Sequence, residues 1–88
     1  MSDTPQQMRQ RLAVLQPASI DIEDESARHA GHEGAKGGGG HYRLRIVSAA
    51  FAGKSTVQRH RMVYDALGEM MRREIHALSV RAIEAEES

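Results

Sequence analysis

The residues best equipped for chemistry in this sequence are its five histidines, because it contains no cysteine. Neutral imidazole is a common ligand for borderline metals, including iron. The absence of cysteine excludes disulfides, thiolate nucleophiles, thiolate zinc sites and any cluster held by cysteine alone. The sequence therefore favours metal or cluster ligation through histidine, and the five candidates are His29, His32, His41, His60 and His76.

Each histidine also has an ordinary structural interpretation. His29 and His32 fall in a long loop, where function concentrates but where solvated polar side chains are also common. His41 begins a predicted strand and is expected to pair locally. His60 lies close to the apolar stripe of a predicted helix, which favours a partly buried histidine over a ligand. His76 follows that helix and can interact with the carbonyls of its last turn.

Catalytic motifs are weak, so we expect no enzymatic activity. Gly53-Lys54-Ser55 follows a strand and precedes a helix, as the end of a phosphate-binding loop would. That motif needs a glycine five positions before its second glycine, and Ser48 occupies the position. Asp24 and Glu25 are adjacent in the sequence, so their carboxylates are expected to point apart and not to share a site.

The length of 88 residues fits one domain with a modest core. We expect residues 1–88 to form this domain, with its folded core at about 8–83, a glycine-rich loop at 25–40 and an acidic tail at 84–88. The N-terminus lacks the features of a signal peptide, and no apolar run approaches the ~20 residues of a membrane span. These features predict a cytoplasmic protein without membrane contact.

The zero net charge hides an uneven distribution. Residues 28–61 carry seven basic side chains and one acidic side chain, whereas residues 1–25 and 62–88 are both net acidic. A basic middle can attract an anionic partner, either nucleic acid or a small acidic molecule. The alternative is a pair of solvated faces on a strand and a helix.

Two helices and three strands are predicted, in the order α-β-β-α-β. The first helix begins at residues 4–7, with Thr4 as cap, and ends at Pro17. Its apolar residues repeat at i, i+4 and i+7 and form one stripe: Met8, Leu12 and Leu15. Alternation around Ile20 and Ile22, and again over residues 41–48, predicts two strands that pair antiparallel.

The second helix is expected to begin at a cap on Ser55 or Thr56 and to fade near Arg73. A last strand follows around Leu78 and Val80. Helical spacing predicts a core-facing stripe with two further apolar residues beside it: Val57, His60, Tyr64, Leu67 and Met71, with Val63 and Met70.

Three motifs in this order resemble the BolA family. They are Phe51-Ala52-Gly53-Lys54, then Arg59-His60-Arg61-Met62-Val63-Tyr64 with Leu67, then Ile75-His76-Ala77-Leu78. The stretches Asp24-Glu25-Ser26-Ala27-Arg28-His29 and His41-Tyr42-Arg43 resemble the family too, so that the likeness spans residues 8–83. The resemblance implies an α/β (α+β) fold similar to class II KH domains, with both helices on one face of a three-stranded sheet.

The resemblance also implies a partner and a shared cofactor. BolA-like proteins bind monothiol glutaredoxins and share a [2Fe–2S] cluster with them, in cluster trafficking or iron sensing. The glutaredoxin supplies a cysteine, its bound glutathione supplies a second thiolate, and the BolA-like protein supplies histidine. The family's ligand position matches His76. A second ligand position lies in the loop, where His32 is preferred over His29. Alone, the chain is expected to be a monomer or a weak homodimer.

The family's other role, transcription regulation, gives the alternative interpretation. On that interpretation the chain binds DNA through a basic helix start on a KH-like fold, and the contacting residues are Lys54, Arg59, His60 and Arg61. This alternative rests in part on analogy between folds.

Overall fold

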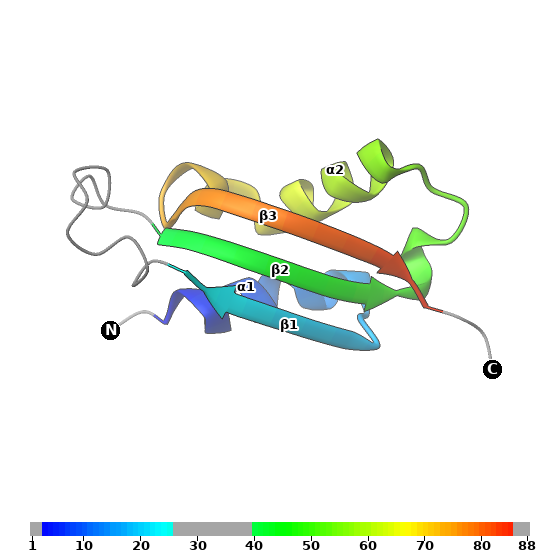
Figure 1. The fold of residues 1–88 in the computed structure, drawn as a ribbon, viewed down its shortest axis with the longest axis horizontal. Helices are drawn as coiled ribbons and strands as arrows, with labels where there is room; N and C mark the ends of the chain where they lie inside the picture. The colour runs from blue at the N-terminus through cyan, green and yellow to red at the C-terminus, as the bar shows by residue number, and fades with distance from the viewer. Residues whose placement is uncertain (1–2, 26–39, 86–88) are drawn as a thin grey trace.

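The computed structural model describes residues 3–25 and 40–85, which form two helices and one three-stranded sheet (Figure 1). The chain order α-β-β-α-β is the predicted one, with short 3-10 turns between elements. The predicted ligands His29 and His32 lie outside the described residues, as does most of the predicted loop. The elements are α1 (Thr4–Leu12), η1 (Ala13–Leu15), β1 (Ser19–Asp24), β2 (Gly40–Ser48), η4 (Ala49–Phe51), α2 (Thr56–Leu67), η5 (Gly68–Arg72) and β3 (Ile75–Glu84).

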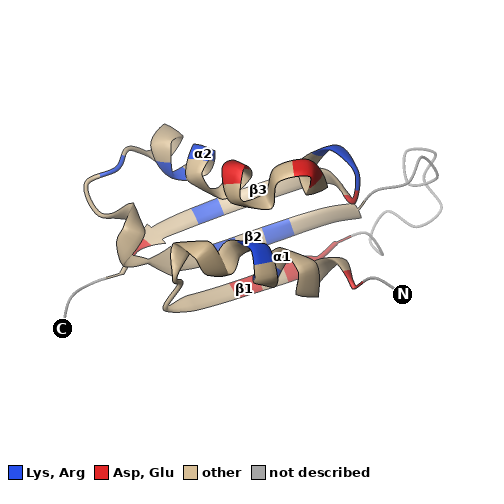
Figure 2. Ribbon diagram, turned by 180° about the vertical axis from the view of Figure 1, so that it is seen from behind, with Lys and Arg blue, Asp and Glu red and all other residues tan. Residues whose placement is uncertain are grey.

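The central strand of the sheet is β2. It pairs antiparallel with β1, as predicted, and parallel with β3. A parallel pair needs a crossover connection, which α2 provides between β2 and β3. Both helices lie behind the sheet in Figure 1 and in front of it in Figure 2. The predicted fold class is therefore confirmed, and the sheet face away from the helices, called the open face below, is left uncovered by them.

Strand alternation separates the core from the open face. On β2 the even-numbered residues are buried against the helices, whereas Arg43 and Arg45 are exposed on the open face. The first helix contributes Met8 and Leu12 to the core, as its stripe predicts. The complete core is Met8, Leu12, Tyr42, Leu44, Ile46, Phe51, Val63, Leu67, Met70 and Ile75.

The buried face of α2 differs from the predicted one. Val63 and Leu67 are buried, and Met70 continues the stripe in η5. Val57 and Tyr64, which were predicted to face the core, are exposed. Successive helical residues are ~100° apart, so the choice between Val63 and Tyr64 is a rotation by one position. That rotation is set by how the crossover from β2 to β3 lays the helix on the sheet.

The ends of the helices confirm one predicted cap and correct another. Ser55 caps α2 in a capping box, in which its side chain accepts from the Gln58 backbone and the Gln58 side chain accepts from the Ser55 backbone. At α1 the cap is Asp3, whose side chain accepts from the Gln6 backbone, so the prediction of Thr4 was wrong. A carboxylate one residue earlier reaches the same free N–H groups. The helix ends at Leu12, earlier than predicted.

The strands also extend beyond their predicted limits. Gly40, predicted to close the loop, is the first residue of β2. Glu84, predicted to begin the acidic tail, is the last residue of β3. No helix of the described residues is long and apolar enough to span a membrane.

Candidate metal-ligating site at the bulge of β3

A β-bulge at the start of β3 positions His76. In the β2–β3 register Gly40 pairs with Ile75 and His41 pairs with Ala77, so His76 is an extra residue on β3. A bulge of this kind bends the strand and re-aims a side chain. Ile75 points into the core, whereas His76 and Ala77 are both exposed. The imidazole of His76 is therefore displayed next to a residue that anchors the strand.

Gly40, opposite the bulge, has no room for a side chain. A Cβ added there would lie 2.5 Å from Cε2 of Tyr42. The Gly40 backbone N–H donates to the carbonyl oxygen of Glu74 at 2.8 Å, which closes the sheet just before the bulge. The aromatic ring of Tyr42 thus takes the space beside Gly40 and helps to fix the backbone that carries His76.

The bulge also brings His76 against a second histidine. The ring centroids of His41 and His76 are 5.1 Å apart, and the ring planes are tilted by 39°. His41 is half-buried at the start of β2, and its carbonyl oxygen accepts from the Glu25 backbone at 2.7 Å. The sequence predicts local pairing for His41 and does not connect it with His76. The two residues are 35 positions apart, and neither spacing nor periodicity reports the parallel register that joins them.

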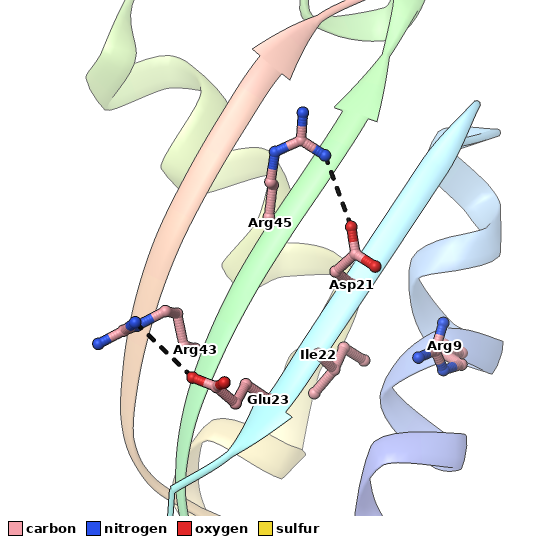
Figure 3. Close-up of a pocket in the computed structure, with 6 residues that line it drawn as sticks. All are labelled: Arg9, Asp21, Ile22, Glu23, Arg43 and Arg45. Carbon is pink, nitrogen blue, oxygen red and sulfur yellow. Dashed lines mark hydrogen bonds and ion pairs between the residues drawn. The ribbon is translucent and has the colours of Figure 1, made fainter.

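The arginines beside this pair on the open face are opposed by carboxylates of β1. Antiparallel register places Asp21 opposite Arg45 and Glu23 opposite Arg43. Their side chains form ion pairs at 3.5 Å and 3.6 Å, drawn in Figure 3. Arg43 also pairs with Glu25 at 3.0 Å, and the Glu25 side chain is only 16% exposed. Of the seven basic side chains in the middle of the sequence, Arg43 and Arg45 are thus paired with carboxylates.

A groove of about 440 Å³ runs beside these ion pairs and contains no histidine (Figure 3). Its arginines are already engaged, since Arg9 donates to the Ile20 carbonyl at 3.2 Å and the other two pair with acids. The groove is therefore not part of the candidate site. Its lining residues are Arg9, Asp21, Ile22, Glu23, Arg43 and Arg45.

The residues predicted to contact nucleic acid lie at the opposite end of the sheet, where α2 begins (Figure 1). Arg59 is only 22% exposed, and its guanidinium donates to the carbonyls of Lys54 and Ala82 and pairs with Glu84. His60 is half-buried and meets the Tyr64 ring edge-on at 6.3 Å. Of the four predicted residues, only Lys54 and Arg61 are exposed.

Within residues 3–25 and 40–85, no three side chains of histidine, cysteine or acid type are grouped closely enough to hold a metal ion. His76 is thus the one predicted ligand whose position is described. It is placed on a strand, displayed on the surface, and in contact with His41.

Comparison with known proteins identifies the fold and its relatives. The family described as BolA-like protein matches residues 12–87. The chain is 47% identical over 73 residues to SufE-like protein 1, chloroplastic/mitochondrial, of Arabidopsis thaliana, covering 77% of this chain and 20% of that protein. It is 44% identical over 77 residues to Protein BOLA1, chloroplastic, of the same plant, covering 83% of this chain and 48% of that protein. The chain thus spans between a fifth and about half of the length of these two curated relatives.

A solved structure agrees with these relatives. The structure of BolA1 from Arabidopsis thaliana matches with a TM-score of 0.79 and 36% sequence identity, covering 100% of this chain and 99% of that one. The same two helices and three-stranded sheet are therefore found over the full length of that domain.

Proposed function

This chain belongs to the BolA-like family, and on that premise we propose that it is a non-enzymatic adaptor for iron–sulfur cluster trafficking or iron sensing. In this proposal it binds a monothiol glutaredoxin and provides His76 as a ligand to a [2Fe–2S] cluster that the two proteins share. Glutathione bound to the glutaredoxin completes the complex. The cluster is the cargo, and the chain contributes an imidazole and a docking surface.

The observation that carries this proposal is the exposure of His76 at the bulge. A ligand for a cluster held by another protein must stand at the surface in a fixed orientation. Ile75, immediately before His76, is buried in the core, and β3 is hydrogen-bonded to β2 along its length. These two contacts hold the backbone at His76 in place. The next open-face residues along β3, Ala77 and Ser79, are small and exposed, which allows a partner surface to approach the imidazole closely.

The donor set fits a shared cluster better than a resident one. The sequence contains no cysteine, so this chain cannot provide the thiolates on which iron–sulfur clusters depend. It can provide imidazole to a cluster whose thiolates come from the glutaredoxin and glutathione. Histidine in place of thiolate makes a cluster less negative and raises its reduction potential, as in Rieske centres.

The nucleic-acid alternative has less support from the geometry. Arg59 is used to join α2 to the end of β3, and His60 is half-buried, which leaves Lys54 and Arg61 as exposed candidates. Two cations give a small electrostatic footprint, because affinity for duplex DNA rises with the number of phosphates contacted. We therefore place the adaptor first.

The test is a titration of the protein into a cluster-loaded, glutathione-bound monothiol glutaredoxin, followed by visible circular dichroism. The wild-type protein should change the spectrum, because the imidazole of His76 alters the environment of the iron. His76→Ala should not change it. His60→Ala is the matched control, since it removes a histidine at the other end of the sheet, and it should behave as the wild type.

Far-ultraviolet circular dichroism of each variant verifies the fold. A folded His76→Ala protein that still gave the wild-type visible spectrum would remove His76 from the site. A wild-type protein that left the spectrum unchanged and did not co-elute with the glutaredoxin would reject the adaptor function itself.

A further inference from the structure

The pair of histidines on the open face has a ring separation that is compatible with coordination of one metal ion. His41 comes from the start of β2 and His76 from the bulge of β3, and their ring centroids are 5.1 Å apart. We propose that these two imidazoles bind one divalent transition-metal ion, with Cu²⁺ preferred over Zn²⁺, in the protein without any partner. This site needs no glutaredoxin, glutathione or cluster.

The ring separation agrees with coordination of a single ion. Metal–nitrogen bonds to histidine are about 2.0–2.1 Å long, and the ring centre lies about 1.1 Å farther, so that an ion sits about 3.2 Å from each ring centroid. For two imidazoles at a tetrahedral angle the centroids are then about 5.2 Å apart, and at a right angle about 4.5 Å apart. The observed 5.1 Å falls between these values, close to the tetrahedral one.

The backbone already holds both residues close to this arrangement. The His41 carbonyl accepts from the Glu25 N–H at 2.7 Å, and Tyr42 beside it is part of the core. The strand carrying His76 is anchored by Ile75, which is also in the core. A metal ion therefore has to fix the side-chain torsions, of which the one at the ring is broad and soft. Ligands placed on strands lose less affinity to disorder than ligands on loops.

The chemistry of the donors sets the preferred metal. Two imidazoles leave the remaining coordination positions to water or to exchangeable ligands, which suits reversible binding. The ring separation alone suits the tetrahedral geometry of Zn²⁺, but the affinity of nitrogen donors is higher for Cu²⁺ than for Zn²⁺ and Ni²⁺, and the preference for Cu²⁺ rests on that affinity. No third histidine or acid joins the pair within the described ranges, so the site does not reach the ligand number of a structural zinc site.

If the proposed function holds, the two roles of His76 exclude each other. An ion held by His41 and His76 occupies the imidazole that the shared cluster would need. This consequence rests on the proposed function, whereas the ion site rests only on the histidine pair.

The test is a titration of Cu²⁺ into the isolated full chain, read by calorimetry and by pulsed electron paramagnetic resonance, which counts coordinated imidazoles. The parent protein for this experiment carries His29→Ala and His32→Ala, so that these two histidines cannot bind the ion. One Cu²⁺ with two imidazoles is expected. His41→Phe and His76→Phe keep a ring at each position but remove its nitrogens, and each should weaken binding by roughly tenfold or more, at least the loss seen when a supporting residue is removed from a metal site.

His60→Phe is the matched control, because His60 also meets an aromatic ring, but that ring belongs to Tyr64 and not to a histidine. It should leave Cu²⁺ affinity unchanged. The proposal is overturned if His41→Phe binds as tightly as the parent, if the resonance signal reports one imidazole, or if His60→Phe weakens binding equally. Because no glutaredoxin is present, each of these outcomes leaves the cluster titration with His76→Ala unaffected.

Discussion

Arg59 donates from Nη1 to the carbonyl oxygen of Ala82 at 3.2 Å, a contact that ties the first turns of α2 to the last residues of β3. The same guanidinium donates through Nε to the Lys54 carbonyl at 3.0 Å and lies 3.6 Å from a carboxylate oxygen of Glu84. One side chain therefore links the turn before the helix, the helix and the strand. Arg59, which was predicted to contact nucleic acid, therefore has a structural role.

Arg59→Ala should destabilise the fold by roughly 1–3 kcal/mol, because two carbonyls lose a charged donor. Arg61→Ala is the matched control, since Arg61 is exposed two positions later and should cost about 0.5 kcal/mol or less. Urea unfolding followed by circular dichroism measures both. Equal costs for the two variants would contradict the linking role.

Gly40→Ala should destabilise the protein by roughly 1–3 kcal/mol, as overpacking of a filled site does. The added methyl group would lie 2.5 Å from the Tyr42 ring, so the ring has to move. In a Tyr42→Leu background the same substitution should cost less, because the crowding atoms are gone. A double-mutant cycle by chemical denaturation measures the coupling. If the losses of stability from Gly40→Ala and Tyr42→Leu were simply additive, the close approach of the two residues would not be the cause of the destabilisation.

Ser55→Ala should lower stability by about 1 kcal/mol, because it removes one half of the capping box at the start of α2. Thr56→Ala, one residue later and also exposed, is the control and should have a smaller effect. Thermal or urea unfolding compares the two. A larger loss of stability for Thr56→Ala than for Ser55→Ala would show that Ser55 is not the cap.

His32→Ala and His29→Ala should each reduce the stability of the cluster complex less than His76→Ala, with His32→Ala the larger of the two. The reason is that His76 stands on a strand anchored by a buried neighbour, whereas both other histidines were predicted for a loop. The decay of the visible circular dichroism of the mixed complex over time measures the effect. Loss of the complex in His29→Ala alone would reverse the predicted order.

Binding to duplex DNA should be weak and should depend on salt with a slope of about −2 in log affinity against log salt, as expected for about two phosphate contacts. Lys54→Ala and Arg61→Ala should each weaken binding to all sequences alike. Fluorescence anisotropy at several salt concentrations measures this. A sequence-specific complex of nanomolar affinity at physiological salt would favour the regulator over the adaptor.

Local patterns in the sequence were sufficient for the order of elements and for one helix cap. Alternation at Ile20 and Ile22 and the spacing of Met8 and Leu12 report interactions between residues two to four positions apart, and these survive in the fold. The Ser55 cap was among the predicted choices for the same reason. His76 was named from motifs that resemble a family, and the match over residues 12–87 confirms that family.

Contacts between distant segments were decided only by the tertiary structure. The pairing of β1 acids with β2 arginines opposes two of the cations in a basic region that looked unopposed along the chain. The face that α2 buries depends on how the crossover lays it on the sheet, and one position of rotation exchanges Tyr64 for Val63. The contact between His41 and His76 depends on a parallel register with one extra residue. Each of these is a pairing between segments, and a sequence pattern does not encode such a pairing because its period describes one segment at a time.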